Sequence, residues 1–374
     1  MINWWLDKGI AGFRIDAITH LKKDLDWASL PADGADGLVT VTKKGQNRPG
    51  LELFLDELKK ETFDKYHAVT IGEAYGVPKK DLAKFIGPAG YFSMIFDFSY
   101  INIDVADVDE WDRGHANWSV TDLKQIIFEY HAAIQAVAGW TANVLENHDQ
   151  PRVLSKLIKD KRYQTPTAAK ALATMYYFLP GVPFIYQGQE IGMKNFERQS
   201  IKEFNDVSSL NNYQVALAAG QDTKTALALV NERSRDNART PMQWDSSQYG
   251  GGFSQTQPWL KMGTDIQGIN VAAEEVDPTS TLNYYRQLAK VRQDPQYHAI
   301  FIEGSLEELK DIPADVLGYQ RVWQQRAILV LVNLSPNEQH VTISAGRVLI
   351  NNQTTLDKTA DTINLRPYQA VVLG

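Results

Sequence analysis

The sequence predicts an α/β protein in which parallel β-strands alternate with helices, followed by a small antiparallel β domain. Two observations support this prediction. Up to residue 298, short apolar runs recur between amphipathic stretches, and runs that are apolar on both faces are typical of buried parallel strands with helices on each side. After residue 298 the helical stretches stop, and short β-rich runs follow one another across Asn, Gly, Pro and Asp turns.

Five apolar runs are predicted to form the parallel strands, and each ends near a polar or acidic residue. They are residues 12–18, 68–73, 94–98, 142–146 and 183–187. The predicted helices are residues 50–60, 120–137, 165–179 and 282–296. The carboxyl ends of parallel strands gather at one edge of a sheet, where α/β folds place their chemistry.

The C-terminal β domain is expected over residues 299–374. Its predicted strands are residues 322–332, 341–344, 348–350 and 370–373. Residues 195–268 are rich in Gln, Asn, Ser and Gly, and residues 226–230 form the only clear apolar run among them. A loop of this length is usually functional or a lid. We therefore expect residues 1–298 to form one α/β domain with a long insertion at about 195–270.

Composition narrows the classes of partner and cofactor. The 374 residues have a formal net charge of −7, and acidic and basic residues are interspersed, so nucleic acid and membrane surfaces are not expected partners. The absence of Cys excludes disulfides, Cys-ligated zinc, iron–sulfur clusters and thiol nucleophiles, and it fits a reducing compartment. Residues 1–8 lack the basic and apolar segments of a signal peptide, so a cytoplasmic location is expected.

The first candidate site residues end the first two predicted strands. Arg14 and Asp16 lie two apart on one strand and so share a face, which lets the guanidinium keep the carboxylate ionised. An ionised Asp at the end of a strand is a plausible nucleophile. Glu73 ends the next strand, and Gly72 before it is expected to leave room for a ligand.

His148 and Asp149 end a further strand. A single acid at such a place is more often a helix cap or a salt-bridge partner, but three acids with a His and an Arg, in a chain rich in Trp and Tyr, favour a sugar site. A transition-metal site with Glu146 is disfavoured, because adjacent strand residues face opposite sides and no second His has a ligand spacing. No phosphate-binding loop or Ser/His/Asp set is found, and neither a metal nor a cofactor is expected.

Four motifs resemble one known family. GFRIDAITH at residues 12–20, GEA at 72–74 and ENHDQ at 146–150 resemble, in order, the second, third and fourth signature regions of the alpha-amylase family of glycoside hydrolases. ARTPMQW at residues 238–244 is similar to its oligo-1,6-glucosidase and α-glucosidase branch. The resemblance implies that Asp16 is the nucleophile, Glu73 the general acid/base and Asp149 the acid that stabilises the transition state. It also implies substrate-binding roles for three further residues, Arg14, His148 and Arg239.

Members of this family have a (β/α)8 barrel, a B domain after its third strand and a C-terminal β domain. The resemblance begins just before the fourth strand, so we expect residues 1–298 to form strands four to eight of the barrel and residues 299–374 an antiparallel β-sandwich. The first signature region, the B domain and the usual calcium-binding loop are expected to be missing. The open barrel edges predict self-association, and the incomplete pocket predicts little activity of the chain alone.

The function that the resemblance implies is a retaining α-glucosidase acting on short oligosaccharides. Ala17 follows the nucleophile, and in this family a small residue there goes with α-1,4 specificity whereas Val goes with α-1,6. We therefore expect α-1,4 bonds of the maltose type to be favoured, with oligo-1,6-glucosidase activity close behind. Two alternatives stay open. The chain can be a catalytically incompetent fragment that binds sugar, or a transglycosylase or isomerising relative.

Overall fold

The computed structural model describes residues 1–374 except 35–36, 107–110, 112–113, 115, 248 and 345. The chain divides into two compact units. The first comprises Met1–Ser99 and Glu129–Asn143, and the second comprises Tyr100–Phe128 and Val144–Gly374. The domain boundary expected between residues 298 and 299 stays a prediction.

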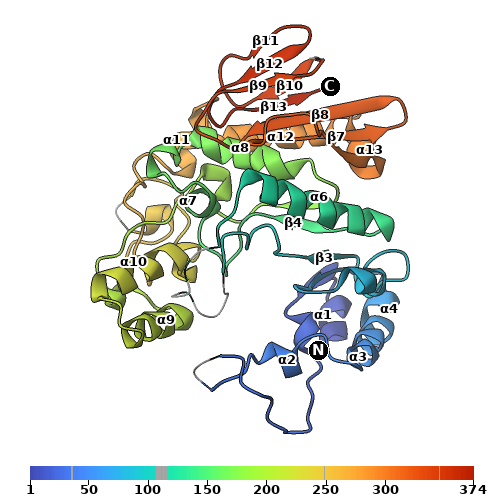
Figure 1. The fold of residues 1–374 in the computed structure, drawn as a ribbon, viewed down its shortest axis with the longest axis vertical. Helices are drawn as coiled ribbons and strands as arrows, with labels where there is room; N and C mark the ends of the chain where they lie inside the picture. Colours follow the sequence, from blue (N-terminus) through green and yellow to red (C-terminus); the bar gives the residue numbers. More distant parts are fainter. Residues whose placement is uncertain (35–36, 107–110, 112–113, 115, 248, 345) are drawn as a thin grey trace. The chain divides into compact units, whose positions relative to one another are not determined.

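Helices and strands are interspersed up to β5, the helices α9 to α13 then follow one another, and after α13 the described elements are strands (Figure 1). The helices are α1 (Ile2–Asp7), α2 (Thr42–Gly45), α3 (Leu51–Leu58), α4 (Asp64–Tyr66), α5 (Leu82–Phe85), α6 (Val120–Ala136), α7 (Val153–Leu157), α8 (Pro166–Tyr177), α9 (Val207–Ala218), α10 (Thr223–Arg233), α11 (Val271–Val276), α12 (Thr281–Gln293) and α13 (His298–Glu303). The strands are β1 (Gly12–Ile15), β2 (Val69–Glu73), β3 (Met94–Phe96), β4 (Ala142–Val144), β5 (Val182–Phe184), β6 (Ser305–Glu308), β7 (Val316–Trp323), β8 (Arg326–Asn333), β9 (Gln339–Thr342), β10 (Val348–Asn351), β11 (Asp357–Lys358), β12 (Thr362–Leu365) and β13 (Ala370–Leu373).

In the first unit, β1, β2 and β3 form a parallel sheet in that order. The register pairs Ile15 with Gly72 and Glu73 with Phe96. Leu51 and Leu55 of α3 are buried in the core of this unit, because they lie four apart and so on one face of the helix. The parallel pairing of Ile15 with Gly72 places the carboxyl ends of β1 and β2 next to each other.

The strand at residues 12–18 is shorter than the sequence predicts. It ends at Ile15, Ala17 takes a left-handed conformation with φ 43°, and a 3₁₀ turn follows at Ile18–His20. Asp16 therefore lies just beyond β1 and not within a strand shared with Arg14. Ile18 is fully buried, which accounts for the apolar residue at the end of the run.

The prediction of one long loop over residues 195–268 was wrong in part, because this stretch contains the two helices α9 and α10. Each begins at an Asp whose carboxylate accepts the backbone N–H three residues on: Asp206 from Ser209 at 3.2 Å and Asp222 from Thr225 at 2.7 Å. Such N-caps satisfy donors that the first helical turn leaves unpaired. Few of the residues in these helices are buried, so neither has a strong apolar stripe.

The C-terminal strands form two antiparallel sheets of the β-sandwich type. One has the order β10-β13-β8-β7-β6 and the other the order β11-β12-β9. Val316, Leu331 and Val371 of the first sheet share a buried cluster with Val341 and Ile363 of the second. The sequence prediction missed β6, β11 and β12, and its single strand at residues 322–332 covers β8 but only the last two residues of β7.

Arg321 on β7 ties the larger sheet to the helices of the second unit. Its side chain is buried, and its guanidinium donates to the carbonyls of Phe178 at 2.8 Å, Phe301 at 3.1 Å, Gly304 at 2.8 Å and Ser305 at 3.3 Å. Burial lowers the pKa of Arg321 to about 10. Its donors satisfy carbonyls at the C-terminal ends of α8 and α13 and at the start of β6, and the last carbonyls of a helix have no partner within the helix.

Candidate functional site

A cluster of three charged side chains lies at the carboxyl ends of β1 and β2. Because Ile15 is paired with Gly72, the residues that follow them lie side by side: Asp16 just beyond the end of β1, and Glu73 as the last residue of β2. Arg14 donates from Nη1 to Asp16 Oδ1 at 2.8 Å and forms an ion pair with Glu73 through Nη2. The structure therefore brings these three predicted site residues together.

The two carboxyls of this cluster have different surroundings. The Asp16 side chain is 75% exposed, whereas that of Glu73 is 18% exposed. Burial first, and then the hydrogen bond with Asp16, raise the pKa of Glu73 to about 7, although Arg14 acts in the opposite direction. Glu73 can therefore hold a proton near neutral pH.

The raised pKa of Glu73 predicts how the variant Glu73→Gln responds to pH. A carboxyl with a pKa of about 7 in the folded chain and 4.5 when unperturbed binds more protons in the folded state between these values, so it lowers stability as pH rises through them. Gln has no such titration. Between pH 4 and pH 8, Glu73→Gln should therefore gain up to about 3 kcal/mol of stability relative to the parent chain.

Urea unfolding at both pH values measures this difference. The same measurement on Glu57→Gln, an exposed acid of α3, is the control and should show no such change. A difference in unfolding free energy between Glu73→Gln and the parent that stays constant from pH 4 to pH 8 would contradict the prediction.

The backbone around this cluster corrects one expectation. A Cβ on Gly72 would lie 2.7 Å from Ile18 Cδ1 and 3.1 Å from Phe92 Cδ2. The sequence prediction, that Gly72 leaves room for a ligand, was therefore wrong: the space beside Gly72 is filled by core side chains. The Ala17 N–H points to Glu73 Oε2 at 3.4 Å, and the Ala17 side chain is exposed.

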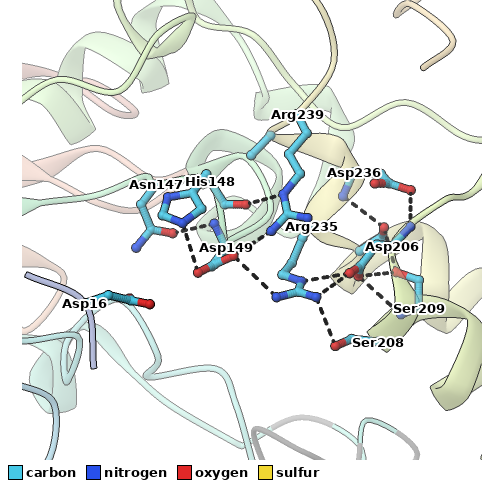
Figure 2. A network of polar contacts seen from close by, with 12 residues as sticks. Asp16, Asn147, His148, Asp149, Asp206, Ser208, Ser209, Arg235, Asp236 and Arg239 are labelled. Carbon is cyan, nitrogen blue, oxygen red and sulfur yellow. Dashed lines mark hydrogen bonds and ion pairs between the residues drawn. The ribbon is translucent and has the colours of Figure 1, made fainter. Parts of the chain in front are cut away.

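A second polar cluster lies after β4, in the second unit (Figure 2). Asp149 Oδ1 accepts from Arg239 Nη2 at 2.6 Å, and Asp149 Oδ2 lies 3.2 Å from His148 Nε2. Arg239 Nε also donates to the His148 carbonyl at 2.8 Å, and the Asp149 N–H donates to Asn147 Oδ1 at 2.8 Å. The structure thus brings together the other three predicted site residues.

The geometry of His148 and Asp149 corrects the argument made against a metal. These residues lie in a turn beyond β4, which ends at Val144, so their side chains meet instead of facing opposite sides. Glu146 points elsewhere: its carboxylate receives Arg152 Nη1 at 3.0 Å and the Val153 N–H at 2.8 Å. Within the described part of the chain, no three His, Asp or Glu side chains form a group that could hold a metal ion.

The Glu146–Arg152 pair is buried, with each side chain 1% exposed. Arg152 also donates to the carbonyls of Gln187 at 2.7 Å and Asn237 at 3.3 Å. The pair links the start of the turn that contains His148 and Asp149 to α7, which follows it, and to the segments that contain Gln187 and Asn237.

The sequence prediction missed Arg235, which also contacts Asp149. Its Nη1 lies 3.4 Å from Asp149 Oδ1 (Figure 2). Arg235 stands four residues before Arg239, just outside the quoted ARTPMQW motif. The spacing of four residues could have indicated Arg235 as a further partner of Asp149, since two arginines one helical turn apart can reach the same carboxylate.

None of the described helices is both long and apolar enough to cross a membrane.

Comparison with known proteins places this geometry in a family. The model of the alpha-amylase catalytic domain matches residues 1–301. The chain is 35% identical over 377 residues to the probable oligo-1,6-glucosidase 3 of Bacillus subtilis strain 168, covering 99% of this chain and 66% of that protein. It is 30% identical to the trehalose-6-phosphate hydrolase of the same organism, covering 100% of this chain and 65% of that protein.

Solved structures of similar proteins support the same family. The trehalose-6-phosphate hydrolase of Bacillus licheniformis matches with a TM-score of 0.86 at 30% identity, over 99% of this chain and 66% of that one. The trehalulose synthase of Pseudomonas mesoacidophila MX-45 matches with a TM-score of 0.88 at 32% identity, with the same coverage. The chain thus spans about two thirds of the length of the proteins it matches.

These matches confirm the predicted fold class, the C-terminal portion of a (β/α)8 barrel followed by an antiparallel β-sandwich. They also confirm the resemblance drawn from the four ordered motifs. Because the catalytic-domain model matches four fifths of its length, and the oligo-1,6-glucosidase relative matches 99% of it, the chain belongs to the alpha-amylase family.

Proposed function

We propose that the protein is a retaining α-glucosidase that hydrolyses terminal α-glucosidic bonds of short oligosaccharides. One observation carries the proposal most directly. Glu73, with a pKa raised to about 7, lies beside the exposed carboxylate of Asp16, and Arg14 contacts both. A retaining glycosidase needs one carboxyl that holds a proton and one that attacks as an anion.

In the proposed reaction, Asp16 attacks the anomeric carbon while Glu73 protonates the leaving oxygen. This gives a covalent glucosyl-enzyme and a free alcohol. Glu73, now ionised, then takes a proton from water, which attacks the anomeric carbon and releases Asp16. The Arg14 guanidinium stabilises the anionic form of either carboxylate, so the charge of Asp16 is balanced before the attack.

Asp149, His148 and Arg239 are proposed to bind sugar hydroxyls. The Asp149 side chain is 38% exposed although it accepts from Arg239, so it retains room to accept hydrogen bonds from a ligand. Its proposed role is to stabilise the transition state through these hydroxyls. These roles use side chains alone, with no metal or cofactor, and cytoplasmic location and self-association stay predictions.

The stereochemistry of the product tests the proposal. A protein that includes this chain, incubated with 4-nitrophenyl α-glucoside and followed by proton NMR, should release α-glucose first. The β-anomer as first product would refute a retaining mechanism, and the absence of any turnover would favour the alternative of a sugar-binding fragment.

A second candidate function is transfer of the glucosyl group to another sugar. Relatives with the same fold include a trehalulose synthase and an isomaltulose synthase. In such a reaction a sugar hydroxyl replaces water in the second step, and the carboxylates act as proposed above. Supplying sucrose or maltose and separating disaccharide isomers from free glucose distinguishes the two functions.

Linkage preference is a separate prediction. Ala17, exposed beside Glu73, favours α-1,4 bonds, whereas the names of the relatives, oligo-1,6-glucosidase and glucan 1,6-alpha-glucosidase, favour α-1,6. We expect maltose to be hydrolysed in preference to isomaltose, and Ala17→Val to shift this ratio toward isomaltose by about tenfold, since one or two methyl groups are worth roughly 1–3 kcal/mol. Initial rates on both disaccharides measure it, and a parent enzyme that clearly prefers isomaltose would refute the α-1,4 prediction.

A further inference from the structure

Arg235 lies between two carboxylates of the second unit (Figure 2). Toward Asp149 it makes one long contact, 3.4 Å from Nη1 to Oδ1. Toward Asp206 it makes two shorter ones, 2.9 Å from Nε and 2.5 Å from Nη2 to Oδ1. Arg235 is therefore anchored by Asp206, and Asp149 is held relative to that anchored guanidinium.

Asp206 is itself fixed on every side. Its side chain is fully buried, and Oδ2 accepts from the N–H and the hydroxyl of Ser209, at 3.2 and 2.8 Å, as the cap of α9. Burial acts to raise its pKa, but the hydrogen bonds from Arg235 and Ser209 outweigh this effect and the pKa is lowered. Asp206 therefore stays ionised at neutral pH and keeps its hold on Arg235.

A second set of bonds joins the segments that contain Asp206 and Arg235. Asp236 Oδ2 accepts the backbone N–H of Asn205 at 2.7 Å and that of Asp206 at 3.1 Å. The Ser209 hydroxyl, whose proton is donated to Asp206, lies 2.8 Å from the Ser234 hydroxyl and can accept from it. Hydrogen bonds of Ser234 and Asp236, the two neighbours of Arg235 in sequence, thus join the turn after α10 to the start of α9.

Arg239 alone does not fix Asp149 in this way. Its guanidinium contacts Asp149 Oδ1 and the carbonyl of the neighbouring His148, so it ties the carboxylate to its own stretch of backbone. Arg235 adds a contact from a guanidinium that is anchored to a different segment, through Asp206 at the start of α9. Charge-assisted contacts from two guanidinium groups to Asp149 Oδ1 restrict rotation of this carboxylate more than one contact does.

We propose that Asp206 and Arg235 are positioning residues that set the orientation of the Asp149 carboxylate for binding sugar hydroxyls. The proposal rests on the sugar-binding role proposed for Asp149. Asp206 and Arg235 need not touch the sugar: they act through Asp149, and their loss should matter only while the Asp149 carboxylate is present.

A double-mutant cycle tests this dependence. The probe is 1-deoxynojirimycin, a glucose-like iminosugar, and its Kd is measured by calorimetry on the full chain. We expect Arg235→Gln and Asp206→Asn each to weaken binding about tenfold, and Arg235→Lys to recover part of the loss, because Lys keeps the charge but not the fork of donors. In an Asp149→Asn background, Arg235→Gln should change the Kd less than twofold. Equal losses in both backgrounds, or no loss in either, would overturn the proposal.

Backbone amide NMR of the same variants gives a readout that does not depend on sugar. Asp206→Asn and Arg235→Gln should shift the amide signals of His148 and Asp149, whereas Arg286→Gln, an exposed ion-pair residue of α12, should not. If the parent chain does not bind the probe, the proposed function fails, and the amide signals still decide the positioning role. Unchanged His148 and Asp149 signals in both variants would refute it.

Discussion

Asp16→Asn and Glu73→Gln are each expected to lower kcat/KM for α-glucoside hydrolysis by several kcal/mol of transition-state stabilisation, on the order of a thousandfold or more. The first variant removes the atom that forms the covalent bond, and the second removes the proton donor and acceptor. Each variant thus loses a group that takes part in the reaction, and not only a contact with the substrate. Steady-state kinetics on maltose and on 4-nitrophenyl α-glucoside measure both.

Rescue experiments distinguish the nucleophile from the general acid/base. An aryl glucoside with a good leaving group should restore much of the first step in Glu73→Gln, and azide should restore turnover in Glu73→Ala, while neither should help Asp16→Asn. Asp64→Asn, an exposed acid at the start of α4, is the matched control and should keep full activity. Near-parental turnover in Asp16→Asn would remove the nucleophile assignment.

Arg152→Ala is expected to destabilise the folded chain by about 3–5 kcal/mol, because it leaves the Glu146 carboxylate buried without its cation. The paired variant Glu146→Leu with Arg152→Met should recover much of this loss, since it removes both buried charges together. The carbonyls of Gln187 and Asn237 still lose their donor, so recovery should be incomplete. Urea unfolding measures the free energies, and equal losses in the single and paired variants would contradict the prediction.

The sequence was sufficient for the parts of the fold that rest on apolar patterning. A strand overlaps each of the five predicted parallel-strand ranges, and α6, α8 and α12 lie close to their predicted ranges. These elements could be predicted because their apolar residues recur with a regular local spacing. The helices α9 and α10 were missed because few of their residues are buried and their caps, Asp206 and Asp222, stand in a polar stretch. In such elements the cap carries more information than the periodicity.

The candidate site divides in the same way. The contact of Arg14 with Asp16 was predicted from their spacing, and it forms although Asp16 lies beyond β1. The reason given for Gly72 was wrong, because the side chains that fill its space, Ile18 and Phe92, come from separate turns of the chain. Asp206 could not be predicted as a partner of Arg235 for the same reason: nothing in the sequence states which distant segments meet.

The four carbonyl contacts of Arg321 have a consequence for how the second unit comes apart. A buried cation whose partners are the ends of two helices cannot leave with the strand without exposing those carbonyls unpaired. The larger C-terminal sheet and the helices α8 and α13 should therefore open as one foldon, with matching amide-exchange protection. A protease that cuts the loop between β6 and β7 should leave the two pieces associated, and a sheet expressed without these helices should not fold on its own.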